Sequence, residues 1–586
     1  MQTAIRHHQA GQLPQAEVLY RQVLQAEPSN ADALHLLGLI AYQSGGNGAA
    51  VELIGRAVAL NGKVPDYHNN LGLALHALGR LEEAVASYRE ALALNPRFAE
   101  AYNNLGTTLQ QQDHLDEAIT NYRHAVELKP DYVHARSNLA GALMTYGLAG
   151  EAIEEFREAI AVGSRYPEAH GNFLMCLNYD PACSPETMRR EALHWAALYA
   201  PVELAMAPIA NVVDPERGLR VGYVSADFRS HPIGYFIEAV LAGHDKSWVE
   251  VFCYANQREN DDLTERLRRN ADHLRDIAGL SDEAVAALIR RDGIDILIDL
   301  SGHTCGNRLL VFARKPAPIQ ATWIGYFATT GLRAMDYIIG DRFVLPPGEE
   351  RHYVEKPLRL PDGYLCFTPP ALPVDVAPLP ALAAGRLTFG SFNNISKINA
   401  AVVALWARIL HSVPNSRLLL KTQTLGSPVM RERCLAQFAE HGVAEAQLAF
   451  AGFSPRAEGL AAYNEVDIGL DPFPYNGGTT TADALWMGVP VITLKGDRFA
   501  GHIAESVLTS AGLPDWVAAS PEEYVEMAIQ WASDLPRLAA LRAGLRQQTV
   551  ASPLCDGARF TRKLELAYRD IWRTWCRHQT RDRTSS

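Results

Sequence analysis

The chain has 586 residues, of which 48% are hydrophobic, a size and composition typical of a folded protein with several domains. The formal net charge of -12 argues against nucleic acid as the main partner, because phosphate backbones attract basic surfaces. Eight cysteines without a CxxC pair suggest neither a disulfide framework nor a zinc site. The chain starts without an apolar signal segment, and no apolar run reaches the roughly 18 residues of a membrane span, so we expect a cytoplasmic protein without membrane contact.

The first third of the chain repeats every 34 residues. Small residues occupy two registers of this period and large residues a third: Gly38, Gly72, Gly106 and Ala140; Ala16, Ala50, Ala84, Ala118 and Ala152; Tyr20, Ile54, Tyr88, Tyr122 and Phe156. Small residues allow paired helices to approach, and the large side chain fills the space between them. The pattern resembles the tetratricopeptide repeat, a helical hairpin that stacks into a superhelix. We expect this all-α superhelix over residues 1–180.

A row of asparagines shares the 34-residue period: Asn70, Asn104, Asn138 and Asn172. Asparagine is not favoured inside helices, so its repetition needs a reason. A helix repeated at one angle places these amides in a row on one face, where they could bind the backbone of an extended peptide. The alternative is that each amide satisfies a neighbouring hairpin, since most polar side-chain hydrogen bonds are intramolecular or to water.

Beyond linker helices expected at 181–217, strands alternate with helices. The first series of expected strands lies in the segments 219–225, 249–255, 293–304, 317–331 and 335–341, and the second in 386–394, 416–422, 447–453, 466–473 and 489–496. The segment 344–364 is expected to be rich in loops. This alternation predicts parallel sheets covered on both faces. We expect two Rossmann-like domains, at 218–380 and 381–586, facing a cleft, with ligands at the carboxyl ends of the strands.

The stretch "NGGTTTADALWMG" joins an expected strand to an expected helix. Gly477 and Gly478 let the backbone turn and approach a ligand, and Thr479 and Thr480 begin the helix, whose free N–H groups attract an anion. Asp483 lies about one turn further and could accept hydrogen bonds from sugar hydroxyls. The alternative is an ordinary helix start with Asp483 as a capping carboxylate.

Two further loops after strands carry candidate catalytic groups. Lys397, in "SFNNISKINA", could offset the charge of a leaving diphosphate, or could be an ordinary surface lysine. His231 precedes Pro232 at a helix start, where the helix dipole disfavours the imidazolium, and a neutral ring there could accept or steer a proton. The alternative is a histidine that caps or packs locally. His303, in "LSGHTCGNR", is a similar candidate with a weaker signal.

Five motifs follow the repeats in a characteristic order: "YVSADFRSHP", "APIQATWIGY", "FNNISKI", "VPNSRLLLK" and "NGGTTTADALWMGVPV". With these motifs the chain resembles, over nearly its whole length, the nucleocytoplasmic protein O-GlcNAc transferases. It is most similar to a compact bacterial homologue of that family. The resemblance implies a tetratricopeptide superhelix followed by an α/β GT-B region. It further implies inverting transfer of GlcNAc from UDP-GlcNAc to Ser or Thr hydroxyls of proteins, without cofactor or metal. The chain has no DxD run in a loop suited to a metal, and Lys397 with helix termini could replace it.

The same resemblance assigns roles to residues. It makes His231 the base or the positioner of the acceptor, Lys397 the ligand of the diphosphate, and Asp483 a ligand of the ribose. The remaining implied sites are Thr479 and Thr480 at the phosphates, Ser454, Pro455 and Arg456 around uracil and ribose, Gly325 to Gly331 at the sugar, and the four-asparagine row as a track for protein acceptors.

The chain departs from the animal enzymes of this family in its donor-binding loops. Asn394 replaces a glutamine and Gly478 a histidine, Gly459 and Ala462 replace base-reading residues, and the large insertion between the catalytic halves is missing. Fewer side chains therefore read the base, which weakens the choice of uridine over guanosine. Two alternatives follow: a protein O-fucosyltransferase that uses GDP-fucose, and a repeat adaptor with an inert catalytic region.

Overall fold

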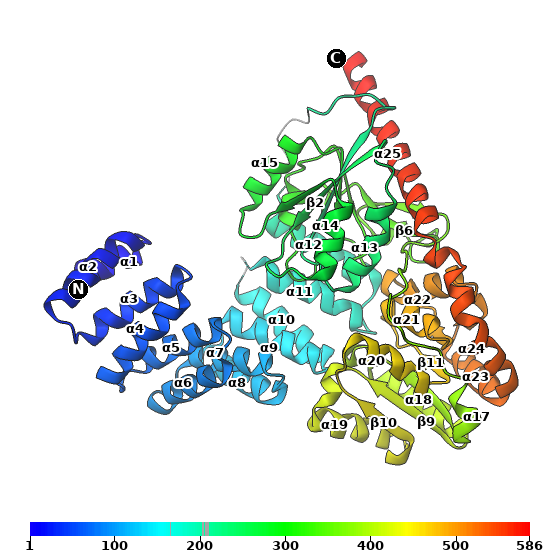
Figure 1. Cartoon of the computed structure of the whole chain (residues 1–586), viewed down its shortest axis with the longest axis horizontal. Helices are drawn as coiled ribbons and strands as arrows, with labels where there is room; N and C mark the ends of the chain where they lie inside the picture. The colour runs from blue at the N-terminus through cyan, green and yellow to red at the C-terminus, as the bar shows by residue number, and fades with distance from the viewer. Residues whose placement is uncertain (164–165, 202–203, 205–209, 586) are drawn as a thin grey trace. The chain divides into compact units, whose positions relative to one another are not determined.

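The computed structural model describes residues 1–163, 166–201, 204 and 210–585 (Figure 1). The chain divides into two compact units, Met1–Gly163 and Ser164–Ser586. None of the helices in the described ranges is long and apolar enough to cross a bilayer.

The first unit is a series of helical hairpins, in which each helix packs on its neighbours in the chain. Its helices are α1 (Gln2–Gln9), α2 (Leu13–Ala26), α3 (Ala31–Gln43), α4 (Asn47–Leu60), α5 (Pro65–Ala77), α6 (Leu81–Leu94), α7 (Ala99–Gln111), α8 (Leu115–Leu128), α9 (Val133–Thr145) and α10 (Ala149–Val162). The 34-residue period therefore corresponds to one hairpin, as the sequence predicts.

Close helix approach explains the small residues of the repeat. A Cβ atom added to Gly72 would lie 2.6 Å from the ring of Tyr88, and one added to Gly106 would lie 2.8 Å from the ring of Tyr122. Both tyrosines are fully buried. The hairpin turns also repeat, with a left-handed residue every 34 positions: Gly11, Gly45, Gly79, Asp113 and Gly147. Glycine adopts this backbone without strain, and aspartate is among the residues that tolerate it.

The second unit contains two parallel sheets. The first has the order β3-β2-β1-β4-β5-β6-β7 and the second β10-β9-β8-β11-β12-β13. The strands are β1 (Leu219–Ser225), β2 (Val249–Ala255), β3 (His273–Asp276), β4 (Ile296–Asp299), β5 (Ile319–Thr322), β6 (Tyr337–Asp341), β7 (Lys356–Leu360), β8 (Leu387–Ser391), β9 (Ser416–Lys421), β10 (Leu448–Ala451), β11 (Ile468–Leu470), β12 (Val491–Leu494) and β13 (Val517–Ala518). The predicted architecture, a repeat region followed by two Rossmann-like sheets in the GT-B manner, is confirmed.

Three edge strands were not predicted. β3 and β7 flank the first sheet and β13 ends the second. β3 is mostly polar, β7 contains Pro357 in the segment expected to be a loop, and β13 has two residues. Edge strands bury less surface than central ones and tolerate proline, so they lack the apolar run that marks a buried strand.

Helices cover both sheets and connect their strands. They are α11 (Pro167–Cys176), α12 (Pro185–Tyr199), α13 (Pro232–Gly243), α14 (Asp262–Asn270), α15 (Asp282–Asp292), α16 (Leu309–Ala313), α17 (Pro380–Ala384), α18 (Ala400–Ser412), α19 (Pro428–Ala439), α20 (Arg456–Ala461), α21 (Thr479–Trp486), α22 (Phe499–Ser510), α23 (Pro521–Ser533), α24 (Leu535–Val550) and α25 (Gly557–Ser585). Several begin with proline in the first turn, where its missing N–H costs nothing.

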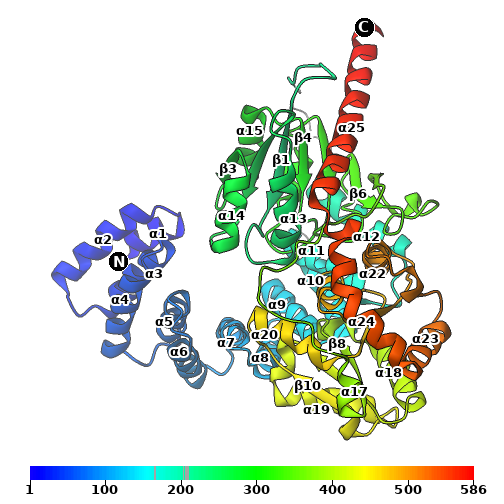
Figure 2. The same ribbon diagram turned by 45° about the vertical axis from the view of Figure 1, so that its right-hand side comes forward.

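The last helix returns to the first sheet, although its sequence follows the second (Figure 2). Tyr568 of α25 is hydrogen-bonded to Tyr223 of β1 through their hydroxyls at 3.3 Å, and Trp572 donates its indole N–H to the carbonyl of Asp214 at 2.9 Å. The segment expected as one domain at 381–586 therefore ends with a helix that packs on the other half.

The helices α11 and α12 belong to the second unit. The boundary between the units follows Gly163, earlier than the end of the superhelix expected at residue 180. Tyr326, in the loop after β5, donates its hydroxyl to the carbonyl of Leu174 in α11 at 3.3 Å. The loops of the first sheet thus attach to this helix pair.

Candidate functional site

A cavity of about 600 Å³ lies at the carboxyl ends of both sheets. The first half contributes loops that follow β1, β4 and β5, and the second half contributes loops that follow β8 and β11. The expected site residues in its lining are His231, Gly325, Asn394, Lys397, Gly478, Thr479 and Thr480. The structure therefore brings together candidates that lie up to about 250 residues apart in the sequence, at the sheet edge where ligands bind in such folds.

A buried aspartate anchors the loops of each half. Asp299, at the end of β4, accepts hydrogen bonds from Gly302 N at 2.8 Å and from the Thr322 hydroxyl at 2.9 Å. Asp471, directly after β11, accepts from Gly477 N and the Thr493 hydroxyl, both at 2.7 Å. Burial raises the pKa of each carboxyl to about 6. Each aspartate ties the loop that leaves its strand to the neighbouring strand.

The glycine-threonine loop ends in a helix start without a side-chain cap among the described residues. The first intrahelical bond runs from Ala482 N to Gly478 O at 3.0 Å, so the N–H groups of Thr479, Thr480 and Thr481 precede it. A Cβ atom on Gly477 would lie 2.5 Å from the Thr480 hydroxyl, and only glycine fits there. Free N–H groups at the cavity wall favour the anion-binding interpretation of this motif.

Lys397 is half-buried and hydrogen-bonded, unlike an ordinary surface lysine. Its ammonium group donates to the carbonyl of Asn476 at 2.7 Å and to Asn393 Oδ1 at 3.3 Å, and lies 3.9 Å from the ring centroid of Tyr475. Burial lowers its pKa to about 8, an effect that the carboxylate of Asp471 opposes. The side chain is thus mostly protonated at pH 7.

His231 combines both roles that the sequence left open. It is the N-cap residue of α13, where its Nδ1 accepts from Ile233 N at 3.4 Å, and it also lines the cavity. Its Nδ1 lies 3.7 Å from Asp227 Oδ2. Burial lowers the pKa of the ring, Asp227 raises it and Arg229 lowers it, and the net direction is downward. A neutral ring that accepts at Nδ1 carries its proton on Nε2.

The other expected donor residues lie outside the cavity lining. Asp483 is buried and forms a two-pronged ion pair with Arg456, with both N···O distances at 2.6 Å. The Arg456 guanidinium lies 5.8 Å from the ring centroid of Tyr235 in α13, so this pair connects the two halves. Pro455 is the N-cap residue of α20, and the Ser454 hydroxyl is buried without a partner among the described residues. Asp483 is therefore an ion-pair partner and not a helix cap.

Several lining residues were not predicted from the sequence. Asn393 accepts hydrogen bonds from both Lys397 and Thr480, the latter at 3.1 Å, and its only sequence signal is the Asn-Asn pair after β8. Ile324 lines the cavity with φ at +66°, a conformation that a β-branched residue rarely adopts. The next residue, Gly325, was expected at the site, and a Cβ atom on it would lie 1.9 Å from the carbonyl of Leu300. Backbone strain of this kind often marks functional sites.

Gly331 and His303 were also expected at the site, but both have structural contacts instead. Gly325 lines the cavity, whereas Gly331 packs against the carbonyl of Ala192 in α12. His303 is fully buried, and its Nε2 lies 2.9 Å from the carbonyl of Thr330. Burial lowers its pKa to about 4, so the ring is neutral and supports the loop instead of lining the cavity.

The asparagine row is part of a hydrogen-bond network in the first unit. Three half-buried amides contact the preceding hairpin: Asn70 the Nε2 of His35 at 2.8 Å, Asn104 the Oδ1 of Asn69 at 3.0 Å, and Asn138 the Oδ1 of Asn103 at 2.9 Å. Asn172 is exposed and belongs to the second unit. These contacts match the alternative in which each amide hydrogen-bonds to a neighbouring hairpin. Binding of protein acceptors along the row stays a prediction.

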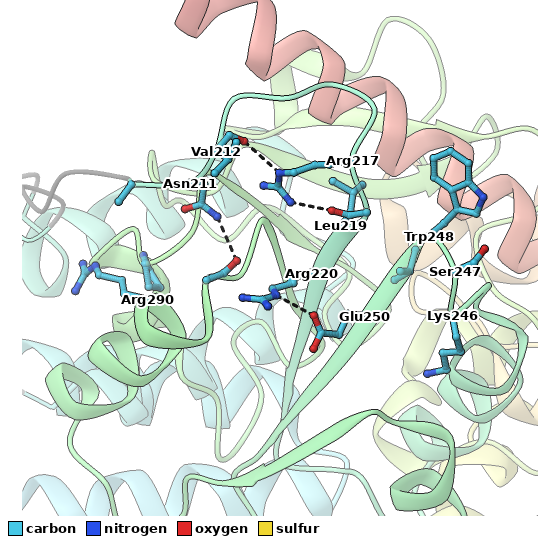
Figure 3. Close-up of a pocket in the computed structure, with 15 residues that line it drawn as sticks. Asn211, Val212, Arg217, Leu219, Arg220, Lys246, Ser247, Trp248, Glu250 and Arg290 are labelled. Carbon is cyan, nitrogen blue, oxygen red and sulfur yellow. Dashed lines mark hydrogen bonds and ion pairs between the residues drawn. The ribbon is translucent and has the colours of Figure 1, made fainter.

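A second cavity, of about 580 Å³, lies at the opposite edge of the first sheet (Figure 3). Its cationic side chains have partners: Arg220 pairs with Glu250 at 2.8 Å, and Arg217 donates to the carbonyl of Gly218 at 2.8 Å. It lies at the amino ends of β1 and β2, away from the edge where ligands bind in parallel α/β sheets.

Known proteins share both regions of the chain. Residues 205–367 and 378–564 match glycosyl transferase family 41, and residues 74–113 and 99–132 match tetratricopeptide repeats. Two relatives are described as a probable UDP-N-acetylglucosamine–peptide N-acetylglucosaminyltransferase SPINDLY. The one from Petunia hybrida is 42% identical and the one from Solanum lycopersicum 40%, each over 410 residues that make up 69% of this chain and 44% of the relative. The chain thus spans less than half the length of these relatives.

A solved structure resembles most of the chain. It is a lysine-to-methionine mutant of the O-GlcNAc transferase from Thermobaculum terrenum, with 38% identity and a TM-score of 0.81, and the match covers 88% of this chain and 98% of that one. Similarity of this extent includes both sheets and part of the helical region.

Proposed function

This chain belongs to glycosyl transferase family 41, and from that premise we propose that it is a protein O-GlcNAc transferase. The reaction would move GlcNAc from UDP-GlcNAc to Ser or Thr hydroxyls with inversion at the anomeric carbon. The names of the relatives and of the solved structure support this donor and this class of acceptor.

One observation carries the proposal: a half-buried lysine and a free helix start face the same cavity. Lys397 and the N–H groups of α21 provide a positive charge and a positive dipole end at one wall. Such groups bind a diphosphate and stabilise the charge that develops on it as it leaves. We propose that they do so here without a metal ion.

His231 is proposed to orient the acceptor hydroxyl. During transfer the hydroxyl oxygen forms a bond to the anomeric carbon, the bond from that carbon to the diphosphate breaks, and the electron pair leaves with UDP. A ring whose Nδ1 accepts from Ile233 N has its proton on Nε2, and it can donate a hydrogen bond there but cannot accept the proton. The hydroxyl proton would then pass to a phosphate oxygen or to water, with His231 holding the hydroxyl in line.

The nucleoside is proposed to lie beside Asp483 and Arg456. Their ion pair holds the Asp483 carboxylate in one orientation, and a carboxylate oxygen can accept a further hydrogen bond from a ribose hydroxyl. The unpartnered hydroxyl of Ser454 offers another polar contact on the same side. Pro455 and Asn394 complete the proposed donor site.

Protein or peptide acceptors are proposed to bind along the repeats, with Asn70, Asn104, Asn138 and Asn172 contacting their backbone. Asn104 and Asn138 already donate to Asn69 and Asn103 of the preceding hairpins, so each would use its remaining hydrogen-bonding capacity for the peptide.

A donor panel tests the function. The purified chain is incubated with UDP-GlcNAc, UDP-glucose and GDP-fucose, with and without a Ser/Thr-rich acceptor protein, and nucleotide release and acceptor mass are measured. We expect a mass gain of one or more GlcNAc units with UDP-GlcNAc. Transfer from GDP-fucose instead would establish the fucosyltransferase alternative, and no turnover with any donor would establish the adaptor.

A further inference from the structure

Two helices outside the catalytic cavity bring three metal-ligating side chains together. Glu191 and His194 are three residues apart in α12, a spacing that places them on one face of the helix. His170 comes from α11. One potential ligand atom from each lies within 4.8 Å of the other two, and the searched, described part of the chain contains no other group of this kind.

The central residue of this cluster is fully buried and unsatisfied. His170 has a relative exposure of 0%, and both of its ring nitrogens lack a hydrogen-bond partner among the described residues. Leaving a buried polar group unpaired costs about 1–3 kcal/mol, so native structures seldom contain such groups without a reason.

The other two side chains of the cluster come from α12. His194 is exposed, and its ring centroid lies 5.4 Å from that of His170. The Oε1 of Glu191 accepts from the Arg190 guanidinium at 3.1 Å, while its Oε2 lies 3.9 Å from His194 Nδ1, beyond hydrogen-bond distance. One carboxylate oxygen and one nitrogen of each imidazole thus lie within 4.8 Å of one another, and no hydrogen bond joins them in the described structure.

We propose that His170, Glu191 and His194 bind a divalent transition-metal cation, with zinc as the test ion, that links α11 to α12. Two imidazoles and a carboxylate are a donor set that suits zinc, with water as the fourth ligand on the exposed side. Tetrahedral ligands around zinc lie about 3.3 Å apart, so small side-chain rotations would close the present spacing.

The cation would be structural and not part of the transfer reaction, because none of the three residues lines the catalytic cavity. The helix pair nevertheless supports the cavity wall. Trp195 packs edge-on against His303 with ring centroids 4.7 Å apart, and the residues after His303 line the cavity. A link between α11 and α12 would therefore stabilise the base of this wall.

The test uses the full chain without an affinity tag, stripped with a chelator and then dialysed. Bound zinc is measured by mass spectrometry, and thermal unfolding is recorded with and without added Zn²⁺. We expect one equivalent of zinc and a higher Tm with zinc present. Glu191→Gln and His194→Gln, on the more accessible face of α12, should each weaken zinc binding at least about tenfold and abolish the Tm shift.

The chain supplies a matched control in α8. His124 and Glu127 form the same three-residue spacing, with Nδ1 and Oε2 3.4 Å apart, but they are exposed and have no third ligand in the described structure. His124→Gln should leave zinc binding and the Tm shift unchanged.

Cobalt distinguishes this site from the free thiols, of which Cys305 is exposed. Co²⁺ at the proposed site should give visible d–d bands without a thiolate charge-transfer band. The proposal is overturned if zinc does not bind stoichiometrically, if the α12 variants bind it as tightly as the control, or if the cobalt spectrum shows thiolate ligands.

Discussion

At the scale of single residues, the site depends on how burial changes ordinary side chains. An exposed lysine would be an ordinary surface cation. The ammonium group of Lys397 is instead half-buried and hydrogen-bonded to Asn476 and Asn393. His231 likewise combines a capping bond with a place in the cavity. In both cases the sequence indicated the residue as a candidate, whereas the protonation state of its side chain follows from the surroundings in the folded protein.

Lys397→Met should lower kcat roughly 10²- to 10³-fold, because the leaving diphosphate loses a preorganised positive group. The methionine keeps the apolar stem, so the Tm should change little. Steady-state kinetics and thermal unfolding measure the two effects. Lys246→Met, which removes an exposed ion pair with Asp272 at the far edge of the first sheet, is the control. Near-normal turnover of a folded Lys397→Met protein would contradict the assignment.

The pKa of Lys397 predicts an alkaline limit to catalysis. Burial lowers this pKa to about 8, so the unliganded protein loses the positive charge as the pH rises through 8. We expect kcat/KM to fall about tenfold per pH unit above that value. A bound diphosphate stabilises the ammonium, so the limit in kcat should lie at higher pH. Lys397→Arg should remove the limit, and a flat wild-type profile up to pH 9.5 would argue against this role.

Two substitutions of His231 separate capping from positioning. Asparagine is a good N-cap, so His231→Asn should keep α13 stable, whereas His231→Ala should cost about 1 kcal/mol of stability. Both should lower kcat about 10²-fold through loss of the in-line position of the hydroxyl, while leaving UDP affinity nearly unchanged. Retained activity in His231→Asn would reduce the residue to a helix cap. Loss of UDP affinity in proportion to the rate would make it a donor-binding residue.

At the scale of elements, periodicity was the reliable signal. The 34-residue repeat predicted the hairpins of the first unit, and the five expected strands of each sheet were found. The edge strands β3, β7 and β13 were missed because their residues are polar, contain proline or are too few to form a pattern. An edge strand is defined by its hydrogen bonds to the neighbouring strand, and the sequence of the edge strand alone does not contain that partner.

The asparagine row belongs to this scale because its role depends on several helices. Replacing both Asn104 and Asn138 with alanine should raise the KM for long protein acceptors and leave hydrolysis of UDP-GlcNAc without acceptor unchanged. Since these amides also bond to Asn69 and Asn103, the Tm of the variant must be recorded alongside.

Asn121→Ala is the matched control, because Asn121 is partly exposed on α8 and donates within its own helix, to the carbonyl of Glu117. Unchanged kinetics with long acceptors in the double variant would leave the row with its structural role alone.

At the scale of the whole molecule, the cavity that contains His231 and Lys397 forms between loops of the two sheets. Loops after β1 and β5 meet loops after β8 and β11, and α25 returns from the second half to pack on β1. The Arg456–Asp483 pair beside Tyr235 is a further link between the halves. Relative movement of the two halves would therefore change the proposed donor site directly.

The metal requirement is a property of this whole arrangement. Since Lys397 and α21 offer charge to the diphosphate, we expect transfer to persist in excess EDTA when assayed well below the Tm. Loss of activity that Mg²⁺ or Mn²⁺ restores would contradict this. The proposed cation between α11 and α12 would affect the Tm instead of the reaction. In His194→Gln this cation site is weakened, so a loss of activity that EDTA causes in the variant would come from a different metal ion.

The sequence by itself determined the elements and the loops that carry chemistry. Repeats, strand-helix alternation and the motif around Gly477 and Lys397 are local patterns, because helix and strand periods and turn residues act over a few neighbours. These patterns also located part of the cavity lining, including His231, Lys397 and the threonines that begin α21.

Only the tertiary structure decided which groups meet. Several features depend on contacts between distant segments. They are the ion pair of Arg456 with Asp483, the left-handed Ile324 beside the cavity, the return of α25 to the first sheet and the cluster around His170. Packing between elements fixes such contacts, and burial then sets the charge of Lys397 and His231. A local pattern contains neither the partner nor the burial, so these features appear only once the chain is folded.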